Sequence, residues 1–208
     1  MHKNVIVEED SKLIAKGECI DWELLNNTTV LVTGSTGIIG STLVKGLLMR
    51  NEQYNSNITV ISLVRNIEKY NKIYCEYMNN PYIIPVMGDI CDFKVDDFNI
   101  EYIIHAACET SSQKFVSNPV DTINTMVCGT NYIMQCAVKK HVRGVVFLSS
   151  MEVYGKPQEN QIMRENEMGY LDPVSVRSSY SEGKRICETL CVSYATQFNL
   201  PVKMIRLA

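Results

Sequence analysis

The chain alternates between short apolar runs and longer segments in which apolar residues recur every three or four positions. Short runs rich in Val, Ile and Leu predict buried β-strands, and the longer periodic segments predict amphipathic helices. Because the two kinds of segment alternate, the pattern predicts an α/β fold with a doubly wound parallel sheet. The runs interpreted as strands lie at 30–33, 58–64, 82–87, 100–104, 145–150 and 201–208.

The first 27 residues precede these strands. Acidic residues at 8–10, a short apolar patch and then Gly17 predict a brief capped helix. The only tryptophan, Trp22, follows this segment. We expect residues 1–27 to form an arm that packs over the sheet and carries no chemistry, and residues 28–208 to form one domain.

Three glycines, each three residues apart, end the first apolar run. Gly34 follows Thr33, Gly37 comes next, and helical spacing resumes after Gly40. In a strand, turn and helix, the first glycine makes the turn, the second lets the backbone approach a phosphate, and the third lets the helix pack closely on the strand. The helix N-terminus would then direct free N–H groups at an anion, so this stretch predicts a cradle for the phosphates of a cofactor.

Composition narrows the class of protein. A chain of 208 residues that is 46% hydrophobic and 21% charged can bury one sizeable core. Its net charge of -3 supplies no basic field, which argues against nucleic acid as a partner. The eight cysteines include no C-x-x-C pair, a pattern typical of reduced thiols in a cytoplasmic enzyme and not of a metal site. No apolar run approaches the ~20 residues of a membrane helix, so we expect a soluble protein.

The end of the second strand bears on the choice of cofactor. In dinucleotide-binding folds an acidic residue about 20 residues past the glycines binds the adenosine ribose. Ser62 is nearest to that position, and no acid is found there. Arg65 follows and could accept a 2′-phosphate, which indicates NADP; otherwise Arg65 is a surface residue of the loop or lies over the adenine.

Hydroxyl, carboxyl and amino groups follow the fifth strand. Ser149 and Ser150 end that strand and Glu152 comes two residues later, at the sheet edge where ligands collect in α/β folds. Tyr180 and Lys184 are four residues apart on a predicted helix, so their side chains share one face. An ammonium and a cationic nicotinamide ring nearby would lower the pKa of Tyr180. Tyr180 could then take a proton from a substrate hydroxyl while Ser150 hydrogen-bonds the reacting oxygen.

In this order, the motifs resemble those of the extended short-chain dehydrogenase/reductases, specifically the NAD-dependent epimerase/dehydratase family that acts on nucleotide sugars. The resemblance covers nearly all of residues 30–208 and rests on T-G-x-x-G-x-x-G at 33–40, Gly-Asp-Ile at 88–90, His-Ala-Ala at 105–107, Ser-Ser at 149–150 and Tyr-x-x-x-Lys at 180–184. It implies a Rossmann-type sheet, NAD or NADP as cofactor, and a homodimer.

The resemblance also implies roles for single residues: Asp89 accepts a hydrogen bond from the adenine amino group, and Asn124 steadies the active-site backbone. The residues expected to bind the cofactor are Gly34, Thr36, Gly37, Ile38, Ile39, Gly40, Ser62, Arg65, Asp89, Ile90, Ala106, Ala107, Asn124, Ser149, Tyr180 and Lys184.

Within the family, segments 150–155 and 180–185 look most like those of UDP-glucuronate decarboxylases. The sugar 4,6-dehydratases carry Asp where this chain has Met151, which argues against a dehydratase. The resemblance implies oxidation at sugar C4 by hydride transfer, then decarboxylation or epimerisation. Glu152 is either a proton shuttle or a carboxylate that pairs locally. Two other hypotheses are a non-catalytic dinucleotide-binding regulator and an NADPH-dependent reductase of a keto substrate. The catalytic residues would be Ser150, Glu152, Tyr180 and Lys184.

Members of the family carry a C-terminal sugar-nucleotide lobe after the sixth strand, and we expect residues 1–208 to lack it. We therefore predict that the 208-residue chain binds the dinucleotide but turns over nucleotide sugars poorly, because little binding energy remains to position a sugar carbon. Separate measurements of cofactor affinity and of turnover on this chain check the prediction. Fast turnover of any nucleotide sugar would contradict it.

Overall fold

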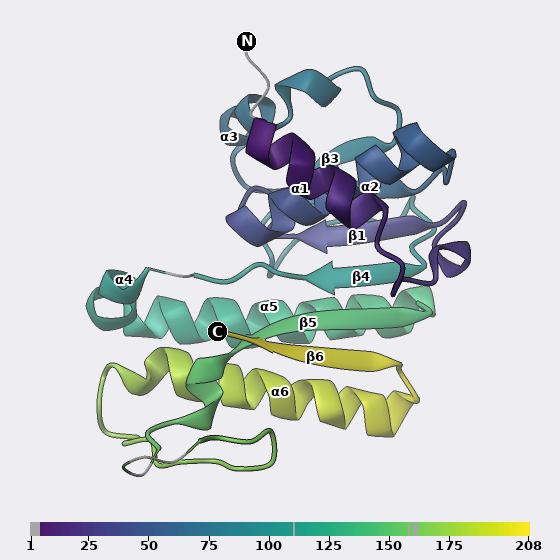
Figure 1. Ribbon diagram of the computed structural model, residues 1–208. Coiled ribbons are helices and arrows are strands. Elements are labelled where there is room, and N and C mark those ends of the chain that lie inside the picture. Colours follow the sequence, from purple (N-terminus) through teal and green to yellow (C-terminus); the bar gives the residue numbers. More distant parts are fainter. Residues whose placement is uncertain (1–4, 110, 158, 160–161) are drawn as a thin grey trace. The chain divides into compact units, whose positions relative to one another are not determined.

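The computed structural model describes residues 5–109, 111–157, 159 and 162–208 (Figure 1). The chain divides into two compact units. The first runs as far as Ala107 and includes Lys140–Arg143, and the second comprises Cys108–Lys139 and Gly144–Ala208. Among the described residues, no helix is both long enough and apolar enough to cross a membrane.

Four parallel strands form the sheet of the first unit, in the order β3-β2-β1-β4. In the register of this sheet Val32 lies beside both Ser62 and Ile104. The predicted strands are confirmed with shifts of one or two residues at their ends. Their bounds are β1 Thr29–Thr33, β2 Thr59–Val64, β3 Ile83–Met87 and β4 Tyr102–His105.

The core of the first unit explains why its central strands are apolar throughout. Apart from Thr29 and Thr59 at their starts, every residue of β1 and β2 is buried, as expected of parallel strands covered on both faces. Helix α2 (Ile38–Tyr54) and two tyrosines near α3 (Ile67–Ile73) pack on one face. The buried cluster they form contains Trp22, Val30, Val32, Val44, Leu47, Leu48, Ile58, Val60, Val64, Tyr70, Tyr74 and Ile83.

The arm contains the predicted helix, α1 (Val5–Ala15), while residues 1–4 lie outside the described residues. The arm was expected to pack over the sheet. Its helix α1 packs on helix α2 instead (Figure 1). The close approach is possible because Gly46 of α2 has no side chain: a Cβ there would lie 2.5 Å from Cγ2 of Ile14. Trp22 donates from Nε1 to the Gly17 carbonyl at 2.9 Å and joins the core, which anchors the arm.

The second unit holds two parallel strands, β5 (Gly144–Ser150) and β6 (Val202–Leu207). Helix α5 spans Pro119–Lys140, and α6 (Ser178–Phe198) contains the Tyr-x-x-x-Lys motif. The two helices approach closely, since a Cβ on Gly183 would lie 2.3 Å from Cε of Met126. The short elements α3, α4 (Ser112–Ser117) and the 3-10 turn η3 (Met151–Tyr154) are additions that the hydrophobic pattern did not predict.

Two glycines of α2 provide a matched test of the packing. A Cβ on Gly40 would lie 2.2 Å from the Gly34 carbonyl oxygen, which is backbone, whereas a Cβ on Gly46 meets only the side chain of Ile14. We expect Gly40→Ala to lower the free energy of unfolding by about 1–3 kcal/mol through overpacking. Gly46→Ala should lower it by less, because its Cβ would meet Cγ2 and Cβ of Ile14 and no backbone atom, so the contact is relieved when the surface helix α1 moves outward, and alanine favours the helix. Urea denaturation measures both changes, and equal losses would refute this account of the turn.

Candidate functional site

The glycine turn of the first unit lies against the residues that follow β4. Gly34 has φ +69°, and a Cβ on it would lie 2.7 Å from backbone atoms of Ala106 and Ala107. Gly37 closes the turn by donating its N–H to the Gly34 carbonyl at 2.9 Å. The structure therefore brings Gly34, Ala106 and Ala107 together, and only glycine fits at the first of these positions.

Hydrogen bonds between buried polar groups hold the glycine turn against the residues that follow β4. Oγ1 of Thr33 lies 2.8 Å from Nδ1 of His105, and the N–H of Ala107 donates to the same oxygen at 3.1 Å. The hydroxyl of Tyr74 donates to the Ser35 carbonyl at 2.5 Å. His105 is thus a buried structural residue, as its sequence context indicates.

The N-terminus of α2 is open beside this turn. Gly37 caps the helix and supplies no side-chain hydrogen bond, so the first N–H groups of the helix have no side-chain cap. Ile38 is 89% exposed and Ile39 is also exposed, whereas Thr36 is half-buried. A helix N-terminus with free N–H groups and a partial positive charge suits a phosphate group.

The predicted contacts at the next two strand ends differ in accessibility. Ser62 is completely buried inside β2, and its hydroxyl has no hydrogen-bond partner within the described part of the chain. Arg65 directly follows β2 and is exposed. Asp89 is exposed and accepts a hydrogen bond from the N–H of Cys91 at 3.0 Å, while Ile90 is buried. Arg65 and Asp89 are open to a ligand, and Ser62 is not.

In the second unit, Tyr180 lies in a tight pocket of side chains. It is only 8% exposed, its ring stacks on that of Phe115 at 4.2 Å between centroids, and its hydroxyl hydrogen-bonds with Ser150. Burial, followed by the negative charge that Cys108 can carry, raises the pKa of Tyr180 to about 12, although the hydrogen bond with Ser150 opposes the rise. Lys184 is not among the groups that shift the pKa of Tyr180 here, and the lowering expected from Lys184 together with a nicotinamide ring stays a prediction.

Lys184 is held away from that role by other partners. It is 3% exposed, donates to the Leu148 carbonyl at 2.7 Å, and lies 4.8 Å from the ring centroid of Phe147. The thiol of Cys108 hydrogen-bonds with both Lys184 and Tyr180, and burial raises its own pKa. Cys108 therefore lies between the two predicted catalytic side chains. Sequence reasoning counted it among scattered cysteines, although its position directly after Ala107 was a usable signal.

Glu152 forms an ion pair with Arg177. Arg177 donates to both of its carboxylate oxygens, at 2.8 and 2.9 Å, and Ser181 donates to one of them at 2.7 Å. Burial alone would raise the pKa of Glu152, but the hydrogen bonds from Arg177 and Ser181 and the charge of Arg177 together lower it. Of the two interpretations of Glu152, local pairing is therefore present in this structure, and no pattern in the sequence indicated Arg177.

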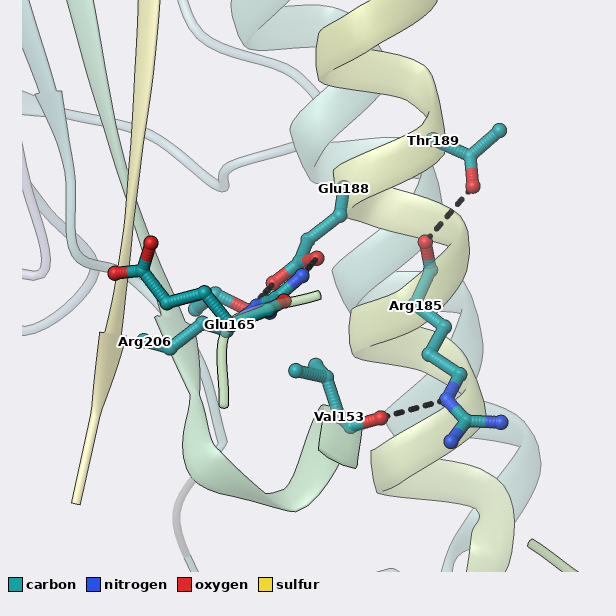
Figure 2. A network of polar contacts seen from close by, with 7 residues as sticks. Val153, Glu165, Arg185, Glu188, Thr189 and Arg206 are labelled. Carbon is teal, nitrogen blue, oxygen red and sulfur yellow. Dashed lines mark hydrogen bonds and ion pairs between the residues drawn. The ribbon is translucent and has the colours of Figure 1, made fainter. Parts of the chain in front are cut away.

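Ser149 belongs to a buried network instead of an open surface. Its hydroxyl donates to Glu188 at 2.5 Å, and Arg206 of β6 donates to both carboxylate oxygens of Glu188 at 2.8 and 3.0 Å (Figure 2). Arg206 also donates to the Glu165 carbonyl at 2.7 Å. Asn124, by contrast, lies exposed on α5, and its side chain forms no hydrogen bond within the described residues.

The loop 155–177 is held by a second arginine. Arg185 of α6 donates to the Val153 carbonyl at 2.7 Å (Figure 2). It also donates to the Gly169 carbonyl at 2.9 Å. Gly155 opens the loop with φ +73°, and a Cβ there would lie 2.8 Å from the Gly169 carbonyl. The loop therefore returns onto the end of η3, close to Glu152.

Comparison with known proteins places these features in a family. Residues 30–208 match the NAD dependent epimerase/dehydratase family. UDP-glucuronic acid decarboxylase 4 of Arabidopsis thaliana is 32% identical over 208 residues, which are 100% of this chain and 45% of that protein. UDP-glucuronic acid decarboxylase 1 of Danio rerio is 28% identical over 86% of this chain and 40% of its own length. The chain spans about half the length of the curated relatives it matches, between 38% and 51%.

Solved structures agree on the fold. UDP-glucuronic acid 4-epimerase from Bacillus cereus, in complex with UDP-glucuronic acid and NAD, has a TM-score of 0.72 at 20% identity, over 86% of this chain and 56% of that one. The dTDP-glucose 4,6-dehydratase DesIV from Streptomyces venezuelae has a TM-score of 0.71 at 26% identity, over 86% and 55%. The expected Rossmann-type fold is confirmed, and the chain belongs to the NAD-dependent epimerase/dehydratase family of extended short-chain dehydrogenase/reductases.

Proposed function

We propose that the protein is an NAD-dependent enzyme that oxidises C4 of a nucleotide sugar and decarboxylates UDP-glucuronate. The observation that carries the proposal is the buried cluster of the second unit, in which Tyr180 hydrogen-bonds with Ser150 while Lys184 lies one helical turn away. The decarboxylase relatives, identical at about a third of positions, support this choice of reaction. A homodimer and a cytoplasmic location stay predictions from the sequence.

The first unit supports NAD as the cofactor. The open N-terminus of α2 and the exposed backbone of Gly37 suit a pyrophosphate, and exposed Asp89 suits an adenine amino group. Solved relatives of the fold are described as complexes with NAD. Bound NAD would supply a positively charged nicotinamide ring that accepts a hydride from the sugar carbon and later returns it.

Tyr180 would take the proton of the C4 hydroxyl during oxidation. With a pKa of about 12 its phenol stays protonated near neutral pH, so it needs more positive charge than Lys184 supplies here. Ser150 would hold the reacting oxygen through its hydroxyl, and Lys184 would bind a ribose hydroxyl through its ammonium group. Because Lys184 is already buried against Leu148, little side-chain entropy is lost when it binds.

A ketone at C4 makes the C5 carboxylate a β-keto acid. The bond from C5 to the carboxyl carbon breaks, carbon dioxide leaves, and the electron pair passes to the C4 enolate. A proton must then reach C5 before the hydride returns to C4, and Glu152, whose charge acts on Tyr180, is the carboxyl group proposed to carry it. Met151 in the dehydratase Asp position also favours decarboxylation over dehydration.

Product analysis of the full-length protein tests the proposal. We expect mass spectrometry to show loss of carbon dioxide from UDP-glucuronate in the presence of NAD, and no change in UDP-glucose or dTDP-glucose. Tyr180→Phe should lower the rate about 10²–10⁴-fold because the proton acceptor is removed. Tyr54→Phe is the control, since Tyr54 is exposed at the end of α2.

Three results would count against the proposal. An unchanged mass with altered chromatographic retention would indicate an epimerase. Preferred turnover of a small keto compound with NADPH would favour the reductase hypothesis. Full function of the Tyr180→Phe variant would favour the non-catalytic regulator.

Arg65 and Ser62 predict how the cofactor is chosen. Arg65→Ala should weaken NADPH binding by about tenfold and NADH binding much less, because only NADPH carries a phosphate for the guanidinium. Ser62→Ala should leave both affinities unchanged and raise the free energy of unfolding by about 1 kcal/mol, because it removes a buried hydroxyl without a described partner. Fluorescence titration and urea denaturation measure these effects. Weaker cofactor binding by Ser62→Ala would show that the serine is a cofactor contact after all.

A further inference from the structure

Arg177 contacts two parts of the catalytic cluster at once. Its guanidinium binds both carboxylate oxygens of Glu152, and its central carbon lies 5.0 Å from the ring centroid of Phe115. Phe115 in turn stacks on Tyr180, with the two rings 12° from parallel. Arg177 thus binds the carboxylate of Glu152 directly, and it supports the phenol of Tyr180 through the ring of Phe115.

We propose that Arg177 is a positioning residue that holds Glu152 ionised and aimed while it supports the ring of Tyr180 through Phe115. The inference rests on the proposed function, since it assigns Arg177 a part in moving the proton that C5 receives. A planar guanidinium suits this task, because it can bind a carboxylate with two parallel hydrogen bonds and stack on an aromatic ring at the same time.

Among the described residues, Arg177 is the cation that acts on Glu152. Ser181 of α6 donates a hydrogen bond but carries no charge, and Tyr180 faces Glu152 with a neutral phenol. Arg185, the next cation along α6, binds the Val153 and Gly169 carbonyls and pairs with Glu182, not with Glu152. Removing Arg177 therefore leaves a partly buried carboxylate without its counter-charge.

The pairing also gives Glu152 the properties of a shuttle. The ionised carboxylate cannot itself donate, so a proton destined for C5 must first be captured. A carboxyl group whose pKa is lowered by Arg177 binds that proton weakly and is a better donor once it holds one. The side chain that keeps Glu152 charged thereby also makes the captured proton easier to transfer.

Nuclear magnetic resonance of side-chain-labelled glutamates tests the electrostatic part without any assay of turnover, with Glu152→Gln used to assign the signal. We expect the pKa of Glu152 to rise in Arg177→Met and to stay close to its original value in Arg177→Lys, which keeps the charge. Arg143→Met, which removes an exposed arginine elsewhere, should leave it unchanged. An unchanged pKa in Arg177→Met would overturn the inference, whatever reaction the protein catalyses.

Kinetics of the full-length protein test the positioning part. Arg177→Met should lower kcat about 10²-fold with little change in KM, and Arg177→Lys should restore kcat only in part because it lacks the planar fork. The limb of the pH profile of kcat that disappears in Glu152→Gln should move to higher pH in Arg177→Met.

A shift in the pKa of Glu152 without any loss of kcat would refute the positioning role. Circular dichroism and the Arg177→Lys variant show whether a loss of kcat comes from a failure to fold. If the proposed function itself is wrong, the full-length protein without any substitution will form no decarboxylated product.

Discussion

The first unit depends on one close approach between two segments that are far apart in sequence. The glycine turn after β1 and the two alanines after β4 pack backbone to backbone, at a distance that excludes any side chain on Gly34. Thr33 binds both His105 and the N–H of Ala107, so the ends of the two neighbouring strands are held in register. The cradle at the start of α2 follows from this contact, because the course of the turn determines where the helix begins.

In the second unit the corresponding constraint is electrostatic. Charged side chains are expensive to bury unless each finds a partner. Lys184 has the Leu148 carbonyl, Glu188 has Arg206 and Ser149, and Glu152 has Arg177 and Ser181. These pairings explain how a strand end and one helix face can carry several ionisable groups within a stable fold. They also mean that each group is presented in one orientation and in a defined charge state.

The sequence predicted what depends on local pattern and missed what depends on distant contacts. Strand positions followed from apolar runs, and the helix that carries Tyr180 and Lys184 followed from their spacing. A count of residues past the glycines led to Ser62, but β2 continues to Val64, so the accessible strand end falls at Arg65. The raised pKa of Tyr180 depends on its burial and on Cys108, which lies far from it in sequence. The ion pair with Arg177 lies in a polar loop without periodicity, which leaves no local signal.

The arginines that hold the loop 155–177 bind its main chain. Arg206 donates a hydrogen bond to the Glu165 carbonyl, and Arg185 donates one to the Gly169 carbonyl. Every residue presents the same backbone carbonyl, whatever its side chain. Mutations among the described residues of the loop can therefore alter exposed side chains while these main-chain contacts are kept. This arrangement separates the evolution of whatever the loop recognises from the stability of the fold that carries it.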